Sequence, residues 1–176
     1  AFPVFFAKNS FPNTLFSGLI MLLSLKQIHQ LELKEDYPAI LCALEDRLIE
    51  FPDEAETVIR LGFNLWLIAS NFGRLEIPEG LEQECGSRFI NLYNEYKFKF
   101  SQNADFCWAF GLGMSIFWHC LPGASEEIGN SLLAMAKAND SFWRRLLGES
   151  GEKVSEEEMK AKLQGRGVLA TYYGVE

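Results

Sequence analysis

The sequence predicts an all-α fold of six or seven helices, stacked as antiparallel helical hairpins with short extended segments at the N- and C-terminal ends. Residues 104–121 are apolar on every side, which is typical of a central helix that is buried all round. Along residues 54–71, apolar side chains recur at spacings of three and four, which indicates an amphipathic helix. Proline, glycine and capping residues separate these segments, so each helix has a defined start and stop.

The first hairpin is expected over about residues 13–51. Its first helix, over about residues 13–31, has Asn13 or Thr14 as a candidate N-cap and a wide stripe of leucines. A charged turn follows. The second helix begins near Pro38, a residue that suits the first turn of a helix because its missing N–H is not needed there.

The second hairpin is expected over about residues 53–100. Asp53 and Glu56 have the spacing of a capping box, and Gly73 is a suitable stop for the helix that they would begin. The next helix runs from about Pro78 to about Phe100. Its end is ambiguous because its last residues alternate between apolar and polar, as in a strand.

The third hairpin is expected over about residues 104–147. Gly111 and Gly113 each destabilise the central helix by about 1 kcal/mol, so we expect a neighbouring helix to approach closely there. Pro122 ends that helix, Ser125 begins the next one, and Asp140 interrupts it.

Residues 152–176 form a C-terminal appendage. Ser155 and Glu158 predict a capping box and a short helix to about Leu163, whereas residues 165–175 are β-prone and are expected to be extended. Residues 1–176 are interpreted as a single helical domain. A shift of 49 residues, which sets Gly62 on Gly111, aligns two helices and is explained equally well by a helical repeat and by chance.

Acidic residues outnumber basic ones by 24 to 16, giving a net charge of −8. Such a surface repels phosphate backbones and attracts basic proteins, so we expect no direct nucleic-acid binding. The apolar stretches 15–25 and 106–120 are shorter than the roughly 20 residues that a membrane-spanning helix needs. The four cysteines have no paired spacing, which favours free buried thiols in a reducing, cytoplasmic compartment.

No catalytic, cofactor-binding or metal-binding residue is assigned. The two glycines of residues 111–113 lack the preceding strand and the third glycine of a dinucleotide-binding loop. His29 and His119 are the only histidines, and the side chains of His119 and Cys120 diverge by about 100° on a helix. We therefore predict that the chain is not an enzyme.

The candidate partner-binding residues are acidic and lie in the turns that would meet at one end of three hairpins. They are Glu32, Glu35, Asp36, Glu76, Glu79, Glu82, Glu84, Glu126 and Glu127. Acids at helix starts commonly serve capping and solubility, which is the simpler explanation. The alternative is a negative patch that docks onto a basic surface.

Residues 165–175 look like the endings of bacterial immunity proteins made against polymorphic toxins, including those of contact-dependent inhibition, and the compact, acidic, helical character of the chain is similar. The resemblance implies a protein that neutralises a cognate toxin, commonly a basic nuclease, by covering its active or substrate-binding surface. Two alternatives remain open. One is a helical-repeat scaffold or regulatory domain of a larger protein. The other is an enzyme or small-ligand receptor with a cavity lined by Trp66, Trp108, Trp118 and His119.

Overall fold

The computed structural model describes residues 22–71, 77–148 and 153–175, and every element in these ranges is helical. The all-α prediction is confirmed, although the described ranges hold nine α-helices and one 3₁₀ turn where six or seven helices were expected. The stacking as antiparallel hairpins and the single domain stay predictions. None of the helices in these ranges is both long and apolar enough to cross a membrane.

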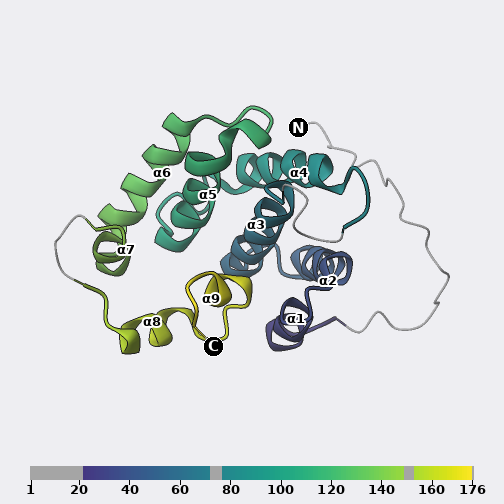
Figure 1. Cartoon of the computed structure of the whole chain (residues 1–176), viewed down its shortest axis with the longest axis horizontal. Helices are drawn as coiled ribbons and strands as arrows, with labels where there is room; N and C mark the ends of the chain where they lie inside the picture. Colours follow the sequence, from purple (N-terminus) through teal and green to yellow (C-terminus); the bar gives the residue numbers. More distant parts are fainter. Residues whose placement is uncertain (1–21, 72–76, 149–152, 176) are drawn as a thin grey trace.

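Figure 1 shows α3 crossing the middle of the molecule. In chain order they are α1 (Leu25–Glu32), α2 (Tyr37–Glu50), α3 (Ala55–Ala69), α4 (Leu81–Tyr96), α5 (Ala104–Phe117), the 3₁₀ turn η1 (Trp118–Cys120), α6 (Glu126–Asn139), α7 (Ser141–Leu146), α8 (Glu156–Leu163) and α9 (Val168–Tyr172).

Helices α3 and α5 form the centre of the core. α3 packs against α2, α4, α5 and α9, and all of its residues except Ala55, Glu56 and Leu67 are buried. In α5, residues 106–114 are all buried, as expected for a helix that is apolar on every side. The expectation fails at the C-terminal end, where the helix gives way to η1 and the side chain of Trp118 is 46% exposed.

Glycines allow α5 and α6 to touch along their backbones, as predicted for Gly111, whereas Gly113 faces the rings of Phe89 and Trp66. A Cβ atom added to Gly111 would lie 3.0 Å from the Cβ of Leu132, and one added to Gly129 would overlap the backbone nitrogen of Ser115. Later residues of α5 therefore face earlier residues of α6, so this pair of helices is antiparallel. A methyl group at either glycine would push the two backbones apart.

Two predictions about helix boundaries are wrong: the helix expected over about residues 13–31 is not continuous, and no capping box begins α3. Residues 22–24 are not helical, and α1 begins only after Ser24, whose side chain accepts a hydrogen bond from the Gln27 backbone in a complete capping box. The predicted caps at residues 13–14 lie outside the described residues. Asp53 and Glu56 form no capping box at α3, because Asp53 pairs with Lys99 and the cap residue is Glu54.

The boundaries of the later helices agree better with the sequence. α4 ends at Tyr96, short of the expected end near Phe100, while the predicted interruption at Asp140 and the capping box of α8 are both confirmed. The extended conformation expected for residues 165–175 is wrong: they contain α9, between two glycines of positive φ, Gly167 and Gly174. Burial against α3 here outweighs the β-propensity of the segment.

Candidate protein-binding surface

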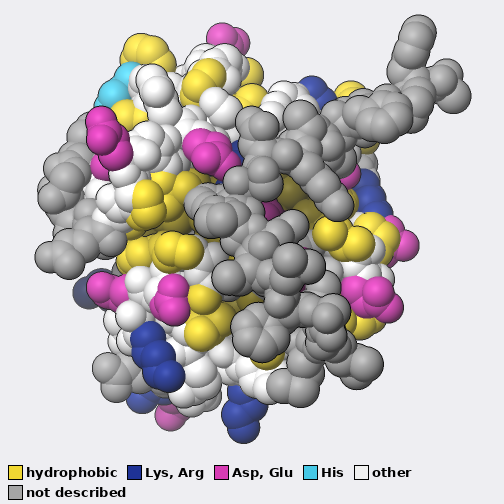
Figure 2. Space-filling model, turned by 90° about the vertical axis from the view of Figure 1, so that its right-hand side faces the viewer, with side chains coloured by type: hydrophobic (Ala, Val, Ile, Leu, Met, Phe, Trp, Pro, Cys, Tyr) yellow, Lys and Arg dark blue, Asp and Glu magenta, His cyan; other side chains and the backbone are white. Residues whose placement is uncertain are grey.

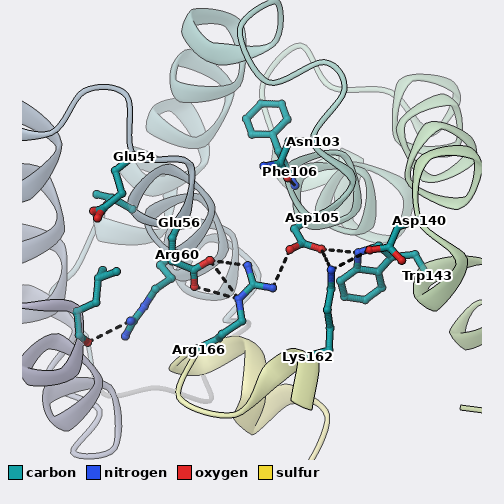
Figure 3. Close-up of polar contacts among 12 residues, drawn as sticks. Glu54, Glu56, Arg60, Asn103, Asp105, Phe106, Asp140, Trp143, Lys162 and Arg166 are labelled. Carbon is teal, nitrogen blue, oxygen red and sulfur yellow. Dashed lines mark hydrogen bonds and ion pairs between the residues drawn. The ribbon is translucent and has the colours of Figure 1, made fainter. Parts of the chain in front are cut away.

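Asp105, in the first turn of α5, is the centre of the most extensive cluster of charged side chains in the described ranges (Figure 3). Its carboxylate accepts hydrogen bonds from Arg166 Nη1 at 2.9 Å and from Trp143 Nε1 at 2.6 Å, and Lys162 Nζ lies 2.9 Å away. Burial raises the pKa of Asp105, but the charges of Arg166 and Lys162, with hydrogen bonds from Lys162 and Trp143, outweigh it. The pKa therefore lies below its usual value.

The same two cations reach further carboxylates. Arg166 Nε donates to both oxygens of Glu56 at 3.1 Å, and Lys162 Nζ donates to Asp140 at 2.8 Å. The segment that carries α8 and α9 is thereby fastened to α3, to α5 and to the break before α7. Because each charge has a partner inside the chain, this cluster fixes the fold and leaves no group directed at a ligand.

A second, more deeply buried ion pair joins α1 to α3. The side chains of Arg60 and Glu32 are only 1% and 3% exposed, and Asn64 Nδ2 donates to the same carboxylate at 3.1 Å. A Cβ atom on Gly167 would overlap the Glu32 carboxylate, so the C-terminal segment lies directly on this pair. Glu32, predicted as a surface residue that meets a partner, is therefore internal.

Three other candidate carboxylates have partners within the chain. Asp36 caps α2 by accepting a hydrogen bond from the Ala39 backbone at 3.3 Å, and Glu82 accepts one from Asn71 at 2.9 Å. Glu84 lies 3.3 Å from an Arg88 nitrogen on the next turn of α4. These contacts serve local structure, as the simpler explanation of acidic helix starts expects.

Four candidate residues are exposed and have no ion-pair partner in the described ranges: Glu35, Glu79, Glu126 and Glu127. Glu35 has a positive φ of 56° in the turn between α1 and α2. Glu126 and Glu127 occupy the first turn of α6, whose cap Ser125 accepts a hydrogen bond from the Ile128 backbone. The remaining candidate, Glu76, lies outside the described residues.

The structure brings two of the three acidic turns near each other. The start of α4 lies beside η1, since a Cβ atom on Gly86 would lie 2.8 Å from the Cys120 carbonyl oxygen. The turn after α1 is elsewhere: in Figure 1, α1 lies at the bottom of the molecule near α9, whereas α4 and the start of α6 lie at the top. On the face seen in Figure 2, Asp and Glu side chains are scattered among hydrophobic ones.

An open, shallow hollow of about 820 Å³ lies at the start of α6. Trp118, Ala124, Ser125, Glu126, Glu127, Asn130, Ser131 and Ala134 line it. Sequence reasoning had identified its two carboxylates but had placed Trp118 in the core. The sequence did contain a signal for the exposure of Trp118. The helix-breaking pair Pro122–Gly123 follows only four residues later, which favours an end of the buried helix near Trp118.

Comparison with known proteins gives no family for the chain. No family model, no curated protein and no solved structure matches it. The functional assignment therefore depends on the surface described above.

The aromatic residues proposed to line a ligand cavity differ in their exposure. Trp66 and Trp108 are buried, and the Trp108 ring is stacked on that of Trp143 at 4.3 Å, whereas Trp118 and His119 are exposed. Within the described ranges, no group of three or more His, Cys, Asp and Glu side chains is placed to hold a metal ion. Of the four cysteines, all free, Cys85 and Cys107 are buried as expected, but Cys42 is exposed.

Proposed function

We propose that this chain is an acidic binding protein that neutralises a basic partner protein, as an immunity protein neutralises its toxin, by covering the partner's active or substrate-binding surface. The main support is the unequal pairing of charge. The most deeply buried cations, Arg60 and Arg166, bind carboxylates of the chain itself. In contrast, Glu79, Glu126 and Glu127 are exposed and have no cation as a partner among the described residues. The net charge of −8 therefore comes from carboxylates at the surface, where it attracts a basic partner and raises its association rate.

The proposed mechanism is steric exclusion guided by charge. A standard interface buries about 1,600 Å² in total, enough to cover an active-site cleft and its rim. Charge complementarity raises the association rate and selects the partner. We further infer that the protein acts in the cytoplasm, where its four cysteines stay reduced, and that its helices stack as antiparallel hairpins, as the register of α5 and α6 suggests.

The test is to co-express the full chain with the product of the neighbouring gene. We expect a stoichiometric complex with nanomolar or tighter affinity, and an association rate that falls as salt concentration rises. Isolation without a complex, or an association rate independent of salt, contradicts the proposal.

Two triple variants, matched in the charge that they remove, test which carboxylates raise the association rate with the partner. Glu79→Gln/Glu126→Gln/Glu127→Gln should lower the association rate about tenfold at low salt. The control, Glu50→Gln/Glu95→Gln/Glu157→Gln, removes the same charge from exposed residues that no ion pair of the described ranges includes, and should change the rate much less. Equal effects of the two variants would mean that only the total charge matters, which contradicts a docking surface at this end.

A further inference from the structure

The hollow at the start of α6 combines an apolar floor with negative charge. Trp118, Ala124 and Ala134 supply the apolar surface, and Glu126 and Glu127 supply two carboxylates. None of the described residues that line it is a lysine, an arginine or a histidine. An occupant with an apolar stem and a positively charged end would therefore match both features.

Trp118 differs from the other tryptophans of the chain. Trp66, Trp108 and Trp143 are at most 3% exposed, whereas Trp118 is 46% exposed because α5 ends one residue earlier and η1 directs the chain outward. Its ring meets the exposed His119 edge-on, at 5.9 Å between centroids. Exposed tryptophan is favoured at the centre of protein interfaces, where it contributes a large rigid contact.

We propose that this hollow receives an arginine or lysine side chain from a basic segment of the partner protein, with the aliphatic stem on the apolar part of the lining and the cation against the Trp118 ring. The identity of the occupant as part of a basic protein rests on the proposed function. Tryptophan is the strongest aromatic partner for a cation, and Glu126 and Glu127 add direct charge attraction.

The positive partial charge at the N-terminus of α6 does not reverse the preference of the hollow for a cation. The N-terminus of α6 has a partial charge of about +0.5, which two full carboxylates exceed. An uncharged helix of a partner protein, or a second copy of this acidic chain, would bury Glu126 and Glu127 without supplying a cation. Burying unpaired carboxylates is unfavourable. The charge of the hollow thus selects a basic occupant over a purely apolar one.

The experiment uses the full chain and its tryptophan fluorescence, with a synthetic nona-arginine peptide as the probe. We expect a saturable change in emission that weakens with salt, together with stronger quenching of the free protein by caesium ions than by iodide. Trp118→Ala should abolish the emission change, while circular dichroism shows the fold intact. Trp118→Phe, which keeps a weaker cation-binding ring, should retain part of the peptide affinity measured by calorimetry.

The charge requirement is tested with a matched pair. Glu126→Gln/Glu127→Gln should weaken peptide binding at least tenfold, whereas Glu50→Gln/Glu95→Gln should change it less than twofold. Equal weakening by both pairs, no binding at all, or an emission change that depends on protein concentration without peptide would overturn the inference, the last by indicating self-association. If a partner complex forms and Trp118→Ala leaves its affinity unchanged, the proposed function stands and this inference is wrong.

Discussion

Replacing Asp105 by asparagine tests whether the C-terminal helices are held by charge. The substitution keeps the shape of the side chain but leaves Arg166 and Lys162 facing a neutral amide at the positions where nitrogens now lie 2.9 Å from the carboxylate. Breaking a buried ion pair costs about 3–5 kcal/mol. Because the Asp105 side chain is 21% exposed and both cations keep a second carboxylate, we expect a smaller loss of about 2–3 kcal/mol.

The effect of Asp105→Asn on the free energy of unfolding should also depend on pH. The pKa of Asp105 is lower in the folded protein than in the unfolded chain, so its contribution is complete above the unfolded value, about 3.9 for an aspartate, and is lost as pH falls through the folded value. The asparagine variant lacks this contribution at every pH. The difference in the free energy of unfolding between the two proteins should therefore be constant near neutral pH and shrink below about pH 4.

The assay is urea unfolding followed by circular dichroism at several pH values, with Glu156→Gln as the control. Glu156 pairs with Lys160 across one turn of α8, but both side chains are exposed, so its removal should have no measurable effect. A loss below about 0.5 kcal/mol for Asp105→Asn, within the range of ordinary surface changes, would refute the role assigned to the cluster. So would a difference that stays constant into strong acid.

Other predictions concern packing, capping and thiol chemistry. Gly129→Ala should destabilise the fold by about 1–3 kcal/mol in thermal unfolding, because the added methyl group meets the backbone of α5; an unchanged melting temperature would contradict the close approach. Ser155→Ala should cost about 1 kcal/mol and speed amide exchange in α8 first. Burial raises the pKa of Cys85 to about 12 and of Cys107 to about 11, so a thiol reagent at pH 8 should label the exposed Cys42 and reach these two only after unfolding.

Sequence reasoning succeeded where the determining contacts are local. The capping box of Ser155 and Glu158 and the interruption at Asp140 each depend on residues within one turn, so the pattern alone predicts them. The close approach of α5 and α6 was also predictable, because glycines within an apolar helix otherwise cost stability without compensation.

It failed where the partner is distant in the sequence. In the sequence, Glu32 looks like an exposed acid in a charged turn. In the structure it forms a buried ion pair with Arg60, which lies 28 residues further along the chain. Glu56 has the spacing of a capping residue, but its carboxylate binds Arg166, which follows 110 residues later. No short-range pattern records such pairings, so carboxylates that fold the chain and carboxylates that face solvent cannot be separated from the sequence.

That separation connects the fold with the proposed function. Arg60, Lys162 and Arg166 fasten α1 and the C-terminal helices to the core, and the same contacts take three cations away from the surface. Lys162 pairs with Asp140, directly after the last residue of α6, so these paired cations lie at the opposite end of that helix from Glu126 and Glu127. Residues 165–175, on which the resemblance to immunity proteins was based, are thus part of the scaffold that holds the core together, while the exposed Glu126 and Glu127 are carried by the other end of α6.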